Sequence, residues 1–188
     1  NVVADSVNAH TGARLTTVTA CYPRFIHSEV MTHRDRERNA ASSRAIPWSK
    51  MRAAIAATPV IPLVFGREQQ GMQTGGEIDD RDAAVKVWLA ARDSARRHAD
   101  DLYALGVHKS IVNRLTEPFM WITIVMTATD WKNFFRLRCH TDAEVHFQKI
   151  AGMLRSAMEA SQPIVRNAGS TADSWHLPFV TDDEREQY

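Results

Sequence analysis

The uncharged run MWITIVMTAT, residues 120–129, constrains the fold more than any other part of this sequence. It is rich in β-branched and aromatic residues, a composition typical of a strand inside a sheet. Two earlier runs, VVADSV and ARLTTVTACY, are also rich in β-branched residues and are separated by the turn-forming segment NAHTG. We therefore expect a sheet that contains an N-terminal hairpin, with the strand at 120–129 in a central position.

Helical periodicity occupies much of the rest of the chain. Apolar residues recur at helical spacing from Asp82 to Leu105, and Gly106 is expected to end that helix. Shorter helices are expected over residues 23–33, 48–57, 109–115, 131–138 and 143–160. Asp130 is expected to cap the helix at 131–138, and a capping box from Thr141 to Glu144 to open the last helix.

The remaining segments carry weaker signals. Residues 59–65 read as a short strand or an extended segment, residues 66–80 as a glycine-bearing loop, and residues 161–174 as a linker. Strands and helices do not alternate as strict βαβ units. The fold class that follows is α+β, or mixed α/β.

Length and charge set broader limits. A chain of 188 residues that is 44% hydrophobic can bury one core, so we expect a single domain over residues 1–188. Whether the full product extends beyond residue 1 or residue 188 stays open. The net charge of +1 gives no general attraction to nucleic acid or to an anionic membrane. The chain has two cysteines, no leader-like start and no long apolar run. These features predict a soluble, cytoplasmic protein.

The stretch THRDRERNAASSRAIP, residues 32–47, holds four arginines and two adjacent serines. Guanidinium and hydroxyl groups are suited to binding phosphate, but a mixed-charge run of this kind is also common in solvated loops. The helix at 131–138 offers a second candidate pair, Asn133 and Arg138, beside three aromatic residues. There, too, the alternative is structural, because aromatic residues fill cores and an arginine can form a surface ion pair.

Other kinds of site have less support. Glu29 and His33 are four residues apart in an expected helix and could supply two metal ligands, but the further ligands of a zinc signature are missing, so no metal site is predicted. A metallohydrolase and an RNA-contacting module remain alternative classes, and each has a direct test: stoichiometric metal for the first, salt-dependent RNA binding for the second.

The arginine-rich stretch resembles the signature of the flavin-dependent thymidylate synthases, R-H-R-x-x-S-x-N-x-x-S-x-R. His33, Arg34, Asn39, Ser42 and Arg44 match it in an ungapped register, while Thr32 replaces the first arginine and Glu37 the first serine. The resemblance continues through YPRFIHSEVMTHR, FGREQQGMQTG, GVHKSIVNRLTEPFMW, TATDWKNFFRLRCHTDAE and WHLPFV, and so covers nearly the whole chain.

This resemblance implies a homotetramer whose active sites lie at subunit interfaces, where each site binds FAD and a pyrimidine nucleotide. The implied flavin ligands are His33, Arg34, Glu37, Asn39, Asn133 and Arg138. The implied nucleotide ligands are Glu29, Ser42, Ser43, Arg44, Arg114 and Arg138. Arg138 and Ser42 are the implied catalytic residues. Asp142 stands where some members of the family have a flavin-contacting histidine.

The implied reaction is reductive methylation at C5 of a uracil nucleotide. NADPH reduces the flavin, methylenetetrahydrofolate supplies the carbon, and Arg138 stabilises charge on the uracil carbonyl. Methylases of nucleoside-antibiotic pathways resemble this family but accept UMP, so UMP and dUMP both remain candidate substrates. A hydroxymethyl product remains an alternative to the methyl product. Loss of a larger side chain at Ala40 could make room for a 2′-hydroxyl.

Overall fold

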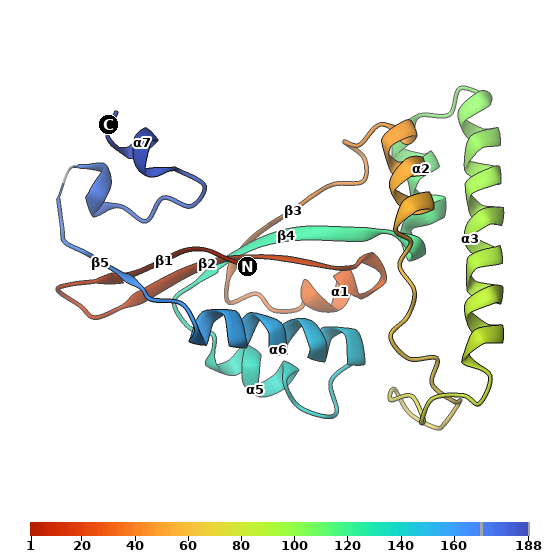
Figure 1. Cartoon of the computed structure of the whole chain (residues 1–188), viewed down its shortest axis with the longest axis horizontal. Helices are drawn as coiled ribbons and strands as arrows, with labels where there is room; N and C mark the ends of the chain where they lie inside the picture. The colour runs from red at the N-terminus through yellow and green to blue at the C-terminus, as the bar shows by residue number, and fades with distance from the viewer. Residues whose placement is uncertain (170, 188) are drawn as a thin grey trace.

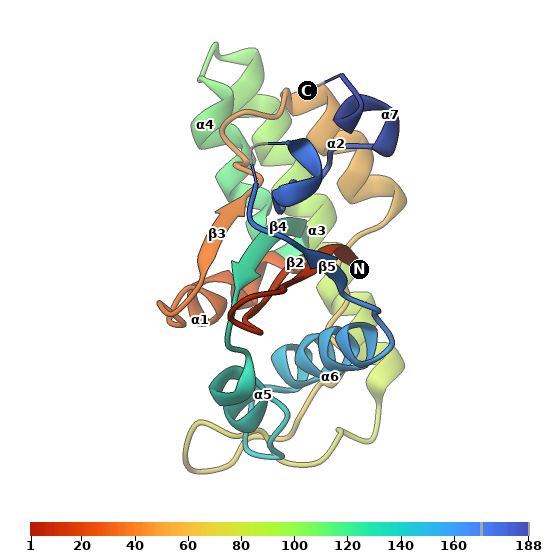
Figure 2. The same ribbon diagram turned by 90° about the vertical axis from the view of Figure 1, so that its left-hand side faces the viewer.

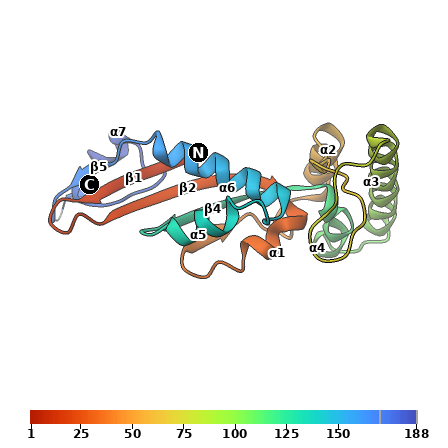
Figure 3. The same cartoon turned by 90° about the horizontal axis from the view of Figure 1, so that it is seen from below.

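The computed structural model describes residues 1–169 and 171–187. Its centre is a five-stranded sheet in the order β3-β4-β2-β1-β5. The strands are β1 Val2–Asn8, β2 Arg14–Pro23, β3 Glu37–Ala40, β4 Trp121–Ala128 and β5 Ile164–Arg166. The molecule is elongated, with the sheet toward one end and a group of helices at the other (Figures 1 and 3). The mixed α+β class is therefore confirmed.

The N-terminal hairpin and the central position of β4 are both confirmed. Asn8 stabilises the β1–β2 turn because its side-chain oxygen accepts hydrogen bonds from the backbone N–H groups of His10 and Thr11, at 2.9 and 2.8 Å. Gly12 then adopts a φ of +71°, which glycine allows without strain. β4 runs antiparallel to both β2 and β3, so its backbone is paired on both sides.

One face of the sheet carries the main core. Alternate residues of β2 and β4 point toward helices α5 (Lys132–Arg138) and α6 (Val145–Glu159), which cover that face (Figure 2). The buried set includes Val18, Tyr22, Ile124, Met126, Phe134, Phe147 and Leu154. Trp131 and Phe134 lie in this core, as the structural alternative for the aromatic residues of 131–138 predicts, and Phe135 packs partly buried against it.

The opposite face is partly covered by the C-terminal segment, which contains η3 (Ala172–Ser174) and α7 (Asp182–Arg185) (Figures 1 and 2). His176 fastens this segment to the sheet. Its ring nitrogens lie 2.6 Å from Ser6 Oγ on β1 and 2.8 Å from Thr17 Oγ1 on β2. Arg185 adds hydrogen bonds to backbone carbonyls of the same segment, including 3.1 Å to that of Leu177.

A second hydrophobic cluster forms the helical end of the molecule. It joins α2 (Trp48–Ala57), α3 (Arg81–Ala104), α4 (Lys109–Val112) and the 3-10 helix η2 (Asn113–Phe119). The predicted α2 and α3 are confirmed, and α3 ends where Gly106 takes a φ of +83°. Within the described residues, every helix is too short or too polar to cross a membrane.

One local prediction is wrong, and one strand was not predicted. The expected linker at 161–174 contains β5, which pairs with β1, and also contains η3. The arginine-rich stretch contains β3, whose backbone pairs with β4 although its residues are polar. Residues 59–65 form an extended segment, the second of the two predicted alternatives, and not a strand. Both missed strands are short and lie at the edges of the sheet.

Three helix predictions also need correction. Residues 23–33 form two short helices, η1 (Arg24–Ile26) and α1 (His27–Val30), rather than one. The helix expected to stop before Pro118 continues as η2 through Phe119. Glu144 itself caps α6 by accepting a hydrogen bond from the Phe147 N–H at 2.9 Å, so the capping box from Thr141 does not form.

Candidate functional site

The centre of the candidate site is His33, which follows α1 and lies at the start of the segment leading to β3. Its ring is buried, and its Nε2 accepts a hydrogen bond of 2.7 Å from Arg138 Nε on α5. Phe134 and Phe147 contact the imidazole edge to face, with ring centroids at 5.2 and 5.8 Å. The structure therefore joins two predicted site residues that are 105 positions apart.

The protonation state of His33 follows from this hydrogen bond. Because Nε2 accepts from Arg138, the ring is neutral and carries its proton on Nδ1. Burial lowers the pKa of His33, and the positive charges of Arg138 and Arg36 lower that pKa further. The imidazole is thus held in the acceptor form around neutral pH.

Two of the four arginines in the stretch have structural roles. The Arg36 side chain is 1% exposed and lies over the rings of Trp131 and Phe134, at 4.8 and 4.4 Å, with Asp35 as its ion-pair partner. Arg38 donates to the backbone carbonyl of His33 and, at 3.2 Å, to that of Met31. These arginines shape the segment around His33.

A cleft of about 810 Å³ opens beside this cluster. Glu29 lines it from α1, Thr32 from the turn after α1, and Arg138 from α5. Loop residues 72–74 and residues 141–145, which lead into α6, close its other sides. Arg138 also donates to Thr32 Oγ1 at 3.3 Å, and its guanidinium lies 4.6 Å from the centre of the Phe147 ring. Arg138 is therefore fixed by three neighbours while it borders the cleft.

Two carboxylates of the cleft differ in protonation behaviour. Burial raises the pKa of Glu29, and the nearby charge of Glu144 raises it further. Burial also acts to raise the pKa of Glu144, but hydrogen bonds from His146 and from the Phe147 N–H outweigh it and lower that pKa. Of these two carboxyl groups, Glu29 is accordingly the one that protonates more readily.

A second group of predicted residues lies where the segment after β3 meets α4 and η2. Ser43 is buried, its hydroxyl donates to Glu117 at 3.0 Å, and its carbonyl accepts from Asn113 Nδ2 at 2.6 Å. Ser42 is exposed, and so are Arg44 and Arg114. The two arginine side chains make no hydrogen bond or ion pair with any residue that the structure describes.

The remaining predicted residues are divided between two sides of the sheet. Glu37 and Asn39 pair with Thr127 and Val125, so they alternate with Arg38 and Ala40 and point away from the α5–α6 face. Ala40 instead packs against the main core and does not line the cleft beside Arg138.

The other predicted residues are exposed. Asn133 lies on α5, where its Oδ1 accepts a hydrogen bond of 2.9 Å from Arg136, and Arg34 is exposed beside His33. Asp142 lines the cleft. One chain thus gathers Glu29, His33 and Arg138 but leaves the second group apart from them.

Several cleft residues were not predicted. Met72, Gln73 and Thr74 line the cleft from the loop that sequence patterns identify only as glycine-bearing. This loop is held by the N–H of Gly75, which donates to the carbonyl of Arg67 at 2.8 Å. Glu144 was predicted only as part of a helix cap. The glycines of this loop were the signal in the sequence. They mark a constrained turn but do not indicate which parts of the fold the turn lies against.

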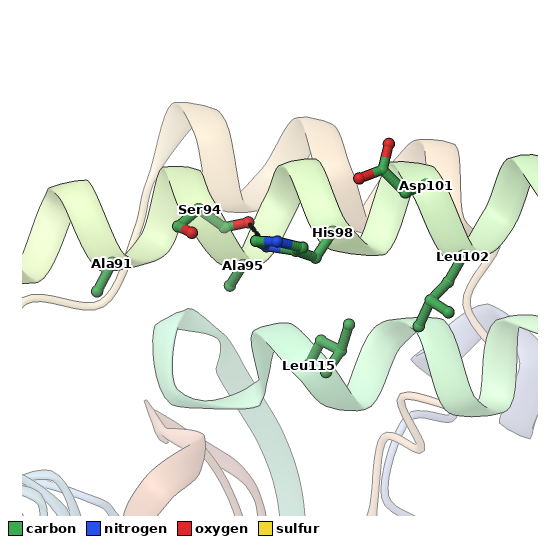
Figure 4. Close-up of a pocket in the computed structure, with 7 residues that line it drawn as sticks. All are labelled: Ala91, Ser94, Ala95, His98, Asp101, Leu102 and Leu115. Atoms are coloured by element: carbon green, nitrogen blue, oxygen red, sulfur yellow. Dashed lines mark hydrogen bonds between the residues drawn. The ribbon is translucent and has the colours of Figure 1, made fainter.

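A separate groove of about 660 Å³ runs along α3 (Figure 4). Ala91, Ala95 and Leu102 line it from α3, and Leu115 of η2 projects toward them. It contains none of the predicted site residues. In the part of the chain that the structure covers, His, Cys, Asp and Glu residues form no group of three or more that could hold a metal.

Comparison with known proteins bears on the fold. No protein-family model matches the sequence, and the search of curated proteins finds no significant match. Among solved structures, the chain is similar to PolB, a UMP/dUMP methylase from Streptomyces cacaoi solved with 5-Br dUMP. The TM-score is 0.63 at 17% identity, and the match covers 77% of this chain and 65% of that protein's chain. The two proteins share a related fold.

Proposed function

We propose that this protein methylates C5 of UMP or dUMP, using methylenetetrahydrofolate as carbon donor and a flavin reduced by NADPH. The observation that carries the proposal is Arg138, a cation fixed by His33, Thr32 and Phe147 at the edge of a cleft large enough for a nucleotide. The similarity in fold to a protein described as a UMP/dUMP methylase supports the same substrate class.

Arg138 would bind and polarise the uracil. Its guanidinium has five N–H donors, of which Nε and one on Nη2 are used within the chain. The remaining donors can bind a uracil carbonyl and stabilise the negative charge that develops there when C5 becomes nucleophilic. Glu29 faces the same cleft, and its raised pKa suits a carboxyl group that donates a hydrogen bond to a carbonyl acceptor.

The second group would bind phosphate. Arg44 and Arg114 are exposed cations without a partner among the described residues, and Ser42 adds a hydroxyl beside them. Forked guanidinium donors of this kind match a nucleotide phosphate. Ser43 would act indirectly, because its hydroxyl already donates to Glu117 and so orients the segment that carries Arg44.

The exposed donors also fit FAD, whose pyrophosphate and ring edges need cations and amides. Arg34, Asn39 and Asn133 are exposed, and Arg34 and Asn39 make no side-chain hydrogen bond with the described residues. These residues, with Glu37, would hold the flavin by charge and hydrogen bonding. When bound and reduced by NADPH, the flavin would supply the hydride that completes the methyl group.

We also propose that the working enzyme is a homotetramer. Glu37 and Asn39 point away from the cleft that holds Arg138, so one chain does not bring the predicted flavin ligands together. Copies of the chain arranged around shared sites would let the second group of one subunit face the cleft of another. Sedimentation of the purified protein, with and without FAD, tests this directly.

The test of the proposed function is product mass. FAD-loaded protein is given NADPH, methylenetetrahydrofolate and either UMP or dUMP without oxygen, and each nucleotide is weighed by mass spectrometry. A methyl increment on either nucleotide supports the proposal and identifies the substrate. A hydroxymethyl increment would replace the proposed product, and no increment on either nucleotide with flavin bound would refute the reaction.

A further inference from the structure

His33 has a buried ring whose one acceptor nitrogen is directed at Arg138. A ligand that donates a hydrogen bond to His33 would need this nitrogen to be free, whereas here Arg138 Nε occupies it at 2.7 Å. The two phenylalanine rings beside it, Phe134 and Phe147, leave the imidazole little freedom to turn. The arrangement is that of a support for the arginine.

We propose that His33 is a positioning residue for Arg138: its neutral ring holds the guanidinium at the cleft, and protonation of the ring releases it and weakens nucleotide binding. The identity of the nucleotide rests on the proposed function. The coupling between the two side chains rests only on their geometry.

The acceptor is essential to this role. In the neutral ring, Nε2 accepts from the Nε–H of Arg138, which fixes the plane of the guanidinium against Phe147 at 4.6 Å. After protonation, the same nitrogen carries a hydrogen, and two donors with positive charge face each other. Only the 3.3 Å contact to Thr32 would remain as a hydrogen bond from Arg138.

The surroundings of His33 reinforce this behaviour. From its own segment, Arg36 and Arg38 disfavour the charged ring and Asp35 favours it. From α5, Arg138 disfavours it, and from α6 the contacting side chain is the apolar Phe147. Three cations thus oppose one half-exposed carboxylate, and together with burial they lower the pKa of the His33 ring.

The first test measures binding of UMP and of dUMP by calorimetry between pH 5 and 8, in three variants. His33→Gln keeps a hydrogen-bond acceptor that does not titrate, and His33→Phe keeps the volume but no acceptor. His140→Gln is the matched control, because His140 is an exposed histidine near the same cleft. The nucleotide phosphate itself titrates near pH 6, and the His33→Gln curve supplies that contribution.

We expect His33→Phe to weaken binding at pH 8 by about 10- to 100-fold, the usual effect of losing a hydrogen bond made by a charged group. His33→Gln should bind within about 3-fold of the wild type at pH 8 and lose the extra fall in affinity at acid pH. His140→Gln should retain that fall. Equal acid sensitivity in the wild type and in His33→Gln would overturn the proposal.

The second test needs no ligand and separates this inference from the proposed function. In nuclear magnetic resonance spectra, the Arg138 Nε–H signal of the free protein should shift with pH at the same midpoint as the His33 ring. The shift should vanish in His33→Gln. An Arg138 signal that ignores the titration of His33 would refute the positioning role, whereas failure of the wild type to bind either nucleotide would refute only the proposed substrate.

Discussion

Replacing Arg36 by methionine should leave the stability of the protein unchanged or increase it. Arg36 is a buried cation with 1% of its side chain exposed, and its Nη1 has no hydrogen-bond partner among the described residues. Its ion-pair partner, Asp35, is 46% exposed and can be hydrated without it. Methionine fills a similar volume and buries no charge.

The expected magnitude follows from opposing contributions. The two ring contacts of Arg36 contribute about 1 to 3 kcal/mol together, and the pair with the half-exposed Asp35 at most about 1 kcal/mol. Two costs oppose these contributions. The unpartnered Nη1 destabilises the folded state by about 1 to 3 kcal/mol, and the removal of the cation from water costs several kcal/mol more. We expect Arg36→Met to change the unfolding free energy by about 0 to +3 kcal/mol.

Urea denaturation of the purified protein measures this change, and the thermal midpoint should rise by about 2 to 4 °C for each kcal/mol gained. Arg38→Met is the matched control, because Arg38 donates to the carbonyls of His33 and Met31 and its loss should destabilise by about 1 to 3 kcal/mol. A loss of more than about 1 kcal/mol in Arg36→Met would show that the buried charge stabilises the segment and would refute the reasoning.

Three other changes test separate parts of the structure. Phe147→Ala should lower the unfolding free energy by about 3 to 5 kcal/mol in urea denaturation, because Phe147 is fully buried in the main core; a loss below about 1 kcal/mol would contradict that burial. Burial acts to raise the pKa of Asp5, but hydrogen bonds from Arg14, Ser161 and Thr16 outweigh burial and lower that pKa. The ionised Asp5 therefore stabilises the fold, and this stabilisation is lost as the pH falls below about 4. Denaturation of Asp5→Asn should therefore show a flatter pH dependence there than the wild type, and parallel curves would contradict the prediction. Arg44→Ala should raise the nucleotide KM at least about 10-fold with flavin content retained; an unchanged KM would remove Arg44 from the site.

The sequence predicts the elements whose own residues decide their structure. The apolar stripe of α3 and the β-branched runs of β1, β2 and β4 carry local patterns that survive in the fold. β3 is mostly polar, and β5 has only three residues, too few for a pattern to be recognised. Glu37 to Ala40 becomes a strand because the free edge of β4 pairs with its backbone, and that pairing depends on a partner more than 80 residues away in sequence.

The candidate site shows the same division. The residue types of the arginine-rich stretch indicate anion binding, but they do not say which arginines face solvent. Arg36 is buried because Trp131 and Phe134 are brought to it by α5, whereas Arg44 stays exposed. Periodicity and composition describe near neighbours along the chain, so the pairing of His33 with Arg138 lay beyond them.

The position of β5 has a consequence for biosynthesis. Ser6 on β1 pairs with Ile164 on β5, so nearly the whole chain must leave the ribosome before the outer edge of β1 is covered. Until then, β1 offers unpaired backbone groups to any other nascent chain, which is the usual route to aggregation of a β-edge. Chaperone dependence during synthesis should therefore be concentrated in the interval before residues 164–166 emerge, and His176 then fastens the completed sheet.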